Sequence, residues 1–275
     1  MARGANRRKL LEKQPNCCFC GGKAKATTIE HAPPKVFFRN KQRPAGLEFP
    51  ACRRCNNGSS QQDQVASYFS VTSGLVEESK ETANKLLQGI ANNTPDVLKL
   101  LSHRSEERMI VRGESQNMVI ANIHPNLRRK WINLWVAKQA FALWYHHTGE
   151  IIDQNGLVSV NWITNHALMQ RGLPEELLNL AVSEGSLEQG KIQVSDQYFY
   201  RFQVSKEEDI GIFMIGAHDA SIYVATKFNA RHKDLSSKRF LKYGDLYRTN
   251  SVKGIHAVPI HALSKIKENA AGFIP

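Results

Sequence analysis

The chain has 275 residues, of which 41% are hydrophobic and 23% charged, a composition typical of a folded protein with a core of its own. No apolar run reaches the roughly 20 residues that span a bilayer, and the basic N-terminus lacks the apolar segment of a secretory signal. We therefore expect a cytoplasmic protein without a membrane partner. The net charge of +12 is concentrated in residues 1–60 (13 Lys/Arg against three Glu) and in residues 227–253 (eight basic against two acidic residues). Basic surfaces of this kind attract phosphate backbones.

The first predicted elements form a short arm and a cysteine-rich segment. Residues 1–16 are predicted to be a basic arm, partly helical, that ends near Pro15. Residues 17–64 follow, with strand composition at 26–30 and 46–51 and the start of a helix after the last cysteine. This order, strand, strand and helix around cysteines, predicts a small ββα module.

The remainder, residues 65–275, is predicted to be a larger α+β domain with an antiparallel sheet. Its strongest helix covers residues 127–147, where aromatic and apolar residues recur at i, i+3 and i+4, a pattern typical of a core-facing helix. Strands separated by polar turns are predicted at residues 157–163, 191–204, 210–216, 221–228 and 255–260. Other expected elements are helices at 76–92, from Pro95, at 174–181 and at 263–269, a strand pair within 109–123 and a basic loop over 229–253.

Four of the five cysteines form two Cys-x-x-Cys pairs, Cys17 with Cys20 and Cys52 with Cys55. Two such pairs suit a tetrahedral Zn²⁺ held by four sulfurs, whereas disulfides are rare in a reducing compartment. A zinc bound this way is closed to water and structural. Cys18 has no partner at that spacing and is predicted to be a bystander.

Three polar side chains beside the cysteines could carry chemistry: Glu30, His31 and Asn56. A histidine can accept a proton near neutral pH. Carboxylate and amide oxygens are hard ligands that suit Mg²⁺ or Mn²⁺. Taken alone, however, a histidine beside a glutamate is more often structural or simply exposed.

The combined motif resembles the zinc-bearing HNH nucleases of the ββα-metal class. It consists of C-x-x-C-G at 17–21, E-H-x-P-P at 30–34, P-x-C-x-x-C-N at 50–56 and S-S-x-x-D at 59–63, which together span less than a fifth of the chain. The resemblance implies a metal-dependent endonuclease that hydrolyses phosphodiester bonds of nucleic acid, with DNA favoured over RNA.

The resemblance also implies a role for each residue. His31 is expected to be the general base, and Glu30 and Asn56 to hold a catalytic Mg²⁺ or Mn²⁺. The family often has an asparagine a few residues before the third cysteine, which orients the base, and in this chain Leu47 stands there. The basic residues expected to contact flanking phosphates are Lys35, Arg39, Lys41, Arg43, Arg53 and Arg54.

Two alternatives stay open from the sequence. One is a non-catalytic, zinc-dependent nucleic-acid-binding protein. The other is an enzyme whose chemistry lies in residues 65–275, although that part shows no Gly-rich phosphate loop, nucleophile elbow or carboxylate cluster.

Overall fold

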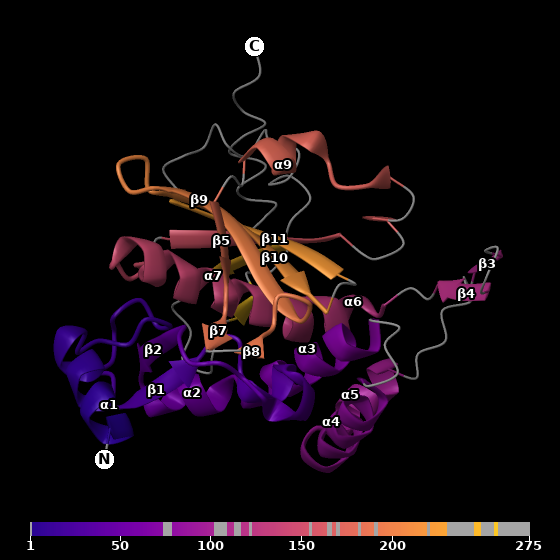
Figure 1. Cartoon of the computed structure of the whole chain (residues 1–275), viewed down its shortest axis with the longest axis horizontal. Helices are drawn as coiled ribbons and strands as arrows, with labels where there is room; N and C mark the ends of the chain where they lie inside the picture. Colours follow the sequence, from indigo (N-terminus) through magenta and orange to yellow (C-terminus); the bar gives the residue numbers. More distant parts are fainter. Residues whose placement is uncertain are drawn as a thin grey trace.

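The structure of the chain, a computed structural model (Figure 1), describes residues 2–73, 79–101, 109–112, 117–120, 123–153, 156–163, 167–168, 171–180, 183–189, 192–218, 221–229, 245–248 and 256–257. The α-helices are α1 (Ala2–Lys13), α2 (Arg53–Gly58), α3 (Ser60–Ser73), α4 (Ser79–Asn93), α5 (Pro95–Leu101), α6 (Pro125–Leu127), α7 (Asn133–Thr148) and α9 (Glu175–Leu180). In the part of the chain that the structure describes, two 3₁₀ turns, η1 (Lys35–Phe37) and η2 (Arg39–Lys41), and one π-helical turn, η3 (Arg128–Ile132), accompany these helices.

The strands of the main sheet are β5 (Gly156–Ile163), β6 (Ser183–Ser186), β9 (Tyr198–Ser205), β10 (Ile210–Ala217), β11 (Ser221–Asn229), β12 (Asp245–Arg248) and β13 (His256–Ala257). They pair in the order β13-β12-β5-β11-β10-β9-β6, and every pair is antiparallel. Among the described residues, three two-stranded sheets are formed by β1 (Thr28–His31) with β2 (Glu48–Ala51), β3 (Met109–Arg112) with β4 (Asn117–Ile120), and β7 (Glu188–Gln189) with β8 (Ile192–Gln193).

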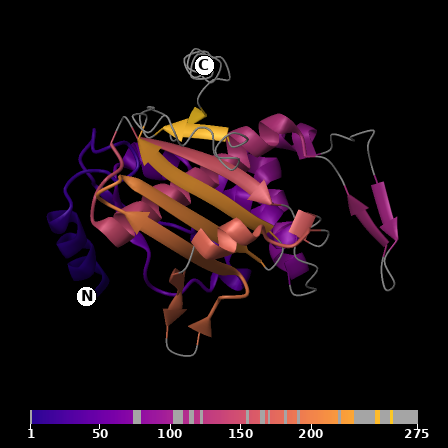
Figure 2. The ribbon, with the colours of Figure 1, turned by 90° about the horizontal axis from the view of Figure 1, so that it is seen from above.

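The central sheet has a helix on each face, as Figure 2 shows from above. Alternate residues of β10 point to opposite faces, as a strand requires. Phe213 and Ile215 join the core around α7, whereas Ile212 and Met214 pack with Leu177 of α9. Helix α7 therefore lies inside the protein, which explains the apolar and aromatic pattern along its sequence.

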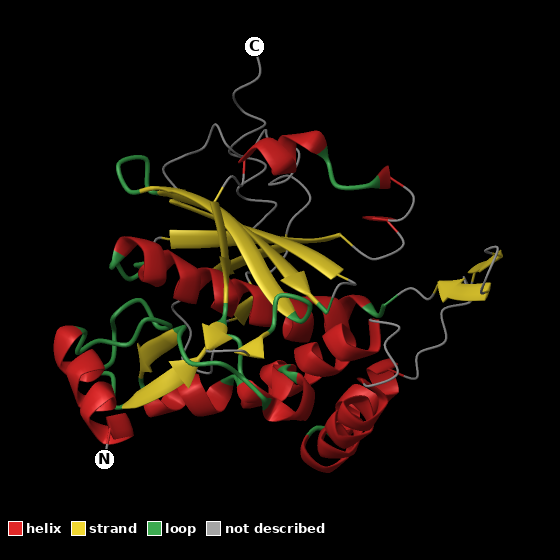
Figure 3. Cartoon of the chain, in the orientation of Figure 1, coloured by secondary structure: helices red, strands yellow, loops and turns green. Residues whose placement is uncertain are grey.

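The cysteine-rich hairpin lies below α7, on the side away from the sheet (Figure 3). One continuous core joins its buried residues to α7 and to the sheet. The ring of Phe37 stacks on Trp135 of α7, with centroids 5.2 Å apart and planes 12° apart. The predicted domain boundary after residue 64 falls inside α3, so the two parts share a helix and a core.

The fold agrees with the predicted class: helices are mixed with antiparallel sheets, which is an α+β architecture. Most predicted strands and helices lie within a few residues of the observed ones. Residues 245–248, predicted to be part of a basic loop, instead form β12, because they pair with β5. The predicted helix at 263–269 lies outside the described residues. None of the described helices is long and apolar enough to cross a membrane.

Candidate functional site

The four paired cysteines meet at one point between the N-terminal turn and the start of α2. The Sγ atoms of Cys17, Cys20, Cys52 and Cys55 all lie within 4.8 Å of one another. Tetrahedral zinc with bonds of about 2.3 Å needs sulfurs roughly 3.8 Å apart, so this arrangement fits the predicted ion. The pKa of Cys20 is lowered because the neighbouring thiols of Cys17 and Cys55 share hydrogen bonds with its sulfur. The group could therefore hold a metal ion such as zinc.

Backbone geometry supports this cluster. The N–H of Cys55 donates to Cys52 Sγ at 3.4 Å, which makes Cys52 the cap of α2, and the N–H of Phe19 donates to Cys17 Sγ at 3.4 Å. Cys18 is buried, and its pKa is raised by that burial. It lies outside the group of four, as predicted.

Glu30 lies in the interior, against α7 and α3. Only 5% of the residue is exposed, and its Oε1 lies 3.2 Å from Nζ of Lys138, which is itself 2% exposed. The same ammonium contacts Asp63 Oδ2 at 2.8 Å and Ser59 Oγ at 2.8 Å. Burial raises the pKa of Glu30 to about 7, while Lys138 opposes this shift. Glu30 is therefore part of a buried ionic cluster formed with Lys138, Asp63 and Ser59.

Asn56 connects α2 to β1. Its Nδ2 donates to Thr28 Oγ1 and to the carbonyl of Ile29, both at 3.0 Å. These bonds join α2 to β1, and β1 pairs with β2 in antiparallel register. As it lies here, the amide group of Asn56 ties α2 to the strand.

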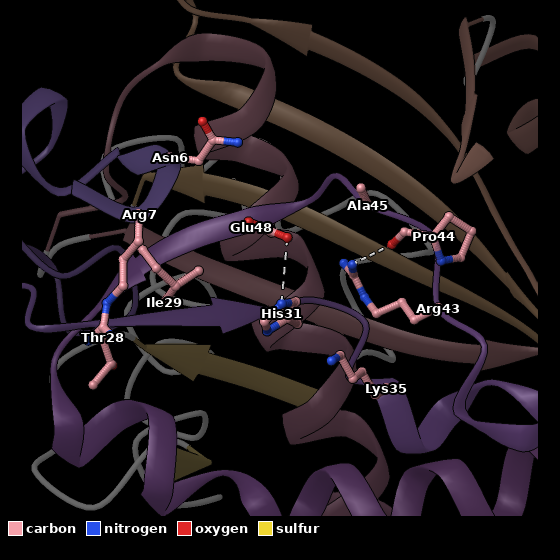
Figure 4. A pocket seen from close by; sticks show the side chains of 10 residues that line it. All are labelled: Asn6, Arg7, Thr28, Ile29, His31, Lys35, Arg43, Pro44, Ala45 and Glu48. Atoms are coloured by element: carbon pink, nitrogen blue, oxygen red, sulfur yellow. Dashed lines mark hydrogen bonds and ion pairs between the residues drawn. The ribbon is translucent and has the colours of Figure 1, made fainter. Parts of the chain in front are cut away.

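His31 lies elsewhere, in an open hollow of about 550 Å³ (Figure 4). Because neighbours on a strand point to opposite faces, His31 faces away from the side chain of Glu30. Glu48, its partner across the hairpin, approaches Nε2 with its Oε1 at 3.6 Å. Burial lowers the pKa of His31, and Arg43 lowers it further. This shift favours the neutral imidazole, the form that can accept a proton.

The walls of this hollow carry mainly positive charge. Its ionisable residues are Arg7 from α1, His31, Lys35, Arg43 and Glu48. Arg7 also donates to the carbonyl of Thr27 at 2.8 Å, which holds α1 beside the hairpin. The predicted N-terminal arm is thus a complete helix that forms one side of the hollow, a role that the sequence alone did not indicate.

Arg43, predicted to contact phosphate, organises the loop between the two strands. Its guanidinium donates to the carbonyls of Pro33 (2.7 Å), Pro44 (2.8 Å), Gly46 (2.7 Å) and Leu47 (3.1 Å). Most of its five N–H donors are thereby used. In the described arrangement Arg43 shapes the wall of the hollow, and few of its donors remain for a ligand.

The other residues predicted to contact phosphate differ in their protein partners and in their exposure. Arg39 is paired with Asp196, and its backbone N–H donates to Gln197 Oε1 at 2.8 Å. Lys35, Lys41, Arg53 and Arg54 are exposed. Of these, Lys35 lines the hollow beside His31.

The structure does not gather Glu30, His31 and Asn56 around one cavity. The hollow at His31 includes neither of the other two. Glu30 Oε2 is buried and has no partner among the described residues, but its other oxygen already pairs with Lys138. A divalent ion there would face a fixed ammonium inside a low-dielectric interior. This donor set does not fit a Mg²⁺ or Mn²⁺ shared by Glu30 and Asn56.

Lys138 is one of the site residues that sequence reasoning did not single out. It occupies a core position in the apolar pattern of residues 127–147. A lysine at such a position is buried only when it is paired, so a carboxylate partner could have been anticipated, although not which one.

Comparison of the chain with protein-family models, with curated proteins and with solved structures gives no match.

Proposed function

We propose that the protein binds nucleic acid and hydrolyses its phosphodiester bonds, as an HNH-type endonuclease in which His31 is the general base. The observation that carries this proposal is the position of His31: at the end of β1, in an open hollow with Arg7, Lys35 and Arg43. The resemblance of the surrounding motif to this family also supports the proposal.

The proposed reaction begins when a ring nitrogen of His31 accepts a proton from water. The water oxygen then forms a bond to phosphorus, the bond between phosphorus and the 3′-oxygen breaks, and the leaving oxygen takes a proton from solvent. Glu48, 3.6 Å from His31 Nε2, favours the imidazolium that forms. Lys35 and Arg7 provide positive charge near the phosphate. Zinc at the four cysteines would hold the hairpin in shape.

The nucleic acid is expected to lie along the basic surface of residues 1–60. Because the exposed Lys41, Arg53 and Arg54 extend the positive charge beyond the hollow, they are proposed to contact flanking phosphates. Such contacts carry no base readout, so binding is expected to be weakly dependent on sequence.

A cleavage assay tests the proposal. Purified protein is incubated with plasmid DNA and with labelled single-stranded DNA and RNA, with and without Mg²⁺ or Mn²⁺. His31→Ala should abolish cleavage, whereas His146→Ala, which changes a half-buried histidine outside the hollow, should retain it. Cleavage that survives His31→Ala would exclude His31 as the base.

One observation favours a second candidate, a non-catalytic nucleic-acid-binding protein that contains zinc. The predicted metal ligand Glu30 is paired with Lys138. If wild-type protein binds the labelled strands and cleaves none of them under any metal condition, this second function replaces the first.

A further inference from the structure

Lys138 is an unusual residue for the middle of a buried helix. It lies on α7 between turns occupied by Trp135 and Phe141, both fully buried. Burying an ammonium is costly unless carboxylates and hydrogen bonds compensate for lost water. Lys138 has those partners in the first half of the chain: Asp63 at 2.8 and 3.0 Å, Ser59 at 2.8 Å and Glu30 at 3.2 Å.

The contact with Glu30 continues to the proposed base. Oε1 of Glu30, the oxygen that pairs with Lys138, also accepts a hydrogen bond of 3.1 Å from the backbone N–H of His31. Two contacts therefore connect α7 to the peptide unit that carries His31. Asp63 and Ser59 belong to the same cluster and have no contact of this kind with His31.

The backbone beside His31 is also held by Leu47, in the loop that leads into β2. Leu47 is buried and has a φ of 48°, in the left-handed region. Its carbonyl accepts from the N–H of Ala32 at 3.2 Å. This bond holds the residue after His31, and the bond to Glu30 holds the N–H of His31 itself.

Resting on the function proposed above, we infer that Lys138 and Glu30 are positioning residues for His31: the ammonium fixes the carboxylate, and the carboxylate fixes the backbone at the base. Glu30 serves in this chain as the acceptor for Lys138 and His31, and not as a ligand of a divalent ion. Lys138 of α7 thus places one positive charge beside β1.

The charges of the buried cluster agree with this assignment. Two buried carboxylates, Glu30 and Asp63, face one ammonium, and the three side chains are almost fully enclosed. Removal of Lys138 would leave buried carboxylates without compensation. The variants must therefore separate loss of folding from loss of positioning.

Four variants make that separation. E30Q keeps an acceptor oxygen at the same place, whereas E30M removes it with a side chain of similar length. D63N is the matched control, because Asp63 contacts the same ammonium but not His31. K138M is combined with D63N, so that only one carboxylate loses its partner. Each variant is checked by thermal unfolding before it is assayed.

Two readouts follow each variant: the kinetic constants for cleavage of a labelled strand, and the amide and imidazole NMR resonances of His31 in protein labelled at histidine. We expect E30M and K138M/D63N to lower kcat about tenfold or more at unchanged KM, and to shift the His31 amide resonance. D63N should leave both unchanged, and E30Q should restore most of the activity that E30M loses. Any dependence of the rate on Mg²⁺ or Mn²⁺ concentration should be the same in E30Q and wild type.

Two results would overturn the inference. A D63N variant as impaired as E30M would show that the cluster acts through general stability. An E30Q variant that needs much more metal would show that Glu30 is a metal ligand. Failure of the proposed function can be distinguished from failure of this inference. If the wild-type protein does not cleave, the NMR spectra still show whether the His31 resonances change in E30M and stay unchanged in D63N. Unchanged resonances in E30M would reject positioning by themselves.

Discussion

His218 donates a hydrogen bond of 2.8 Å from Nε2 to the carbonyl of Phe37. His218 follows β10 in the second half of the chain, and Phe37 belongs to the turn η1 that follows the His31 strand. Their rings also lie close, with centroids 4.9 Å apart. The loop that shapes the His31 hollow is therefore held by the central sheet as well as by its own strands.

This contact predicts a loss of stability in acid. Burial lowers the pKa of His218 to about 4, below its ordinary value of about 6.5. Between these values the unfolded state binds more protons, so the contribution is complete above pH 6.5 and is lost as the pH falls towards 4. A shift of this size corresponds to about 3 kcal/mol at most.

Urea unfolding at several pH values measures this effect. His218→Gln can keep a donor to Phe37 and has no charge to gain, so its free energy of unfolding should fall less steeply between pH 6.5 and 4. If wild type and variant show parallel pH dependence, the contribution of His218 is disproved.

The cysteine cluster predicts one tightly bound zinc per chain. Cys52→Ala should lose the metal and much of the thermal stability, because the ion joins the turn before β1 to α2. Cys18→Ala is the matched control: it removes a buried thiol outside the cluster and should retain full zinc content. Elemental analysis and melting curves are the measurements, and equal zinc content in both variants would contradict the four-sulfur site.

Two basic residues of the hollow should behave differently on substitution. Lys35→Ala should weaken nucleic-acid binding, reduce its salt dependence by about one phosphate contact and leave stability unchanged, because Lys35 is exposed. Arg43→Ala should destabilise the protein by roughly 2–4 kcal/mol, since four backbone carbonyls lose their donor. Binding titrations at several salt concentrations, with chemical unfolding alongside, separate the two. Equal effects of both variants on stability would contradict these roles.

The rate of cleavage should fall in acid as His31 becomes protonated. Because burial and Arg43 lower the pKa of His31, the acid limb of the profile of kcat/KM should lie below pH 6.5. Glu48 raises this pKa, so Glu48→Gln should move the limb to still lower pH. A limb that does not move would show that Glu48 does not act on the base.

The sequence predicted much of the fold because its signals are local. The apolar pattern of residues 127–147 identified the central helix, and the two Cys-x-x-Cys pairs identified the cluster of four cysteines. The predicted strands and the polar turns that separate them indicated the antiparallel sheet in the same way. The π-helical turn at Arg128–Ile132 was not predicted, since the residue pattern there is the same as in an α-helix.

The environment of the site could not be predicted, because it depends on contacts between distant parts of the chain. Glu30 and His31 are neighbours in sequence, yet one faces α7 and the other faces the hollow. Which face each occupies depends on the register of β1, and the partner of Glu30 comes from α7. The sequence predicts that Arg43 contacts phosphate. Only the folded loop shows that its guanidinium binds backbone carbonyls.

The anchoring of the hairpin loop also has a consequence for synthesis on the ribosome. The cysteine cluster is complete once Cys55 has emerged, so a zinc ion could be captured early. The loop around Phe37 can make all its contacts only after Trp135 and then His218 have been synthesised. A chain released before residue 218 could carry metal at its cysteines while the loop around Phe37 still lacks its contact with His218.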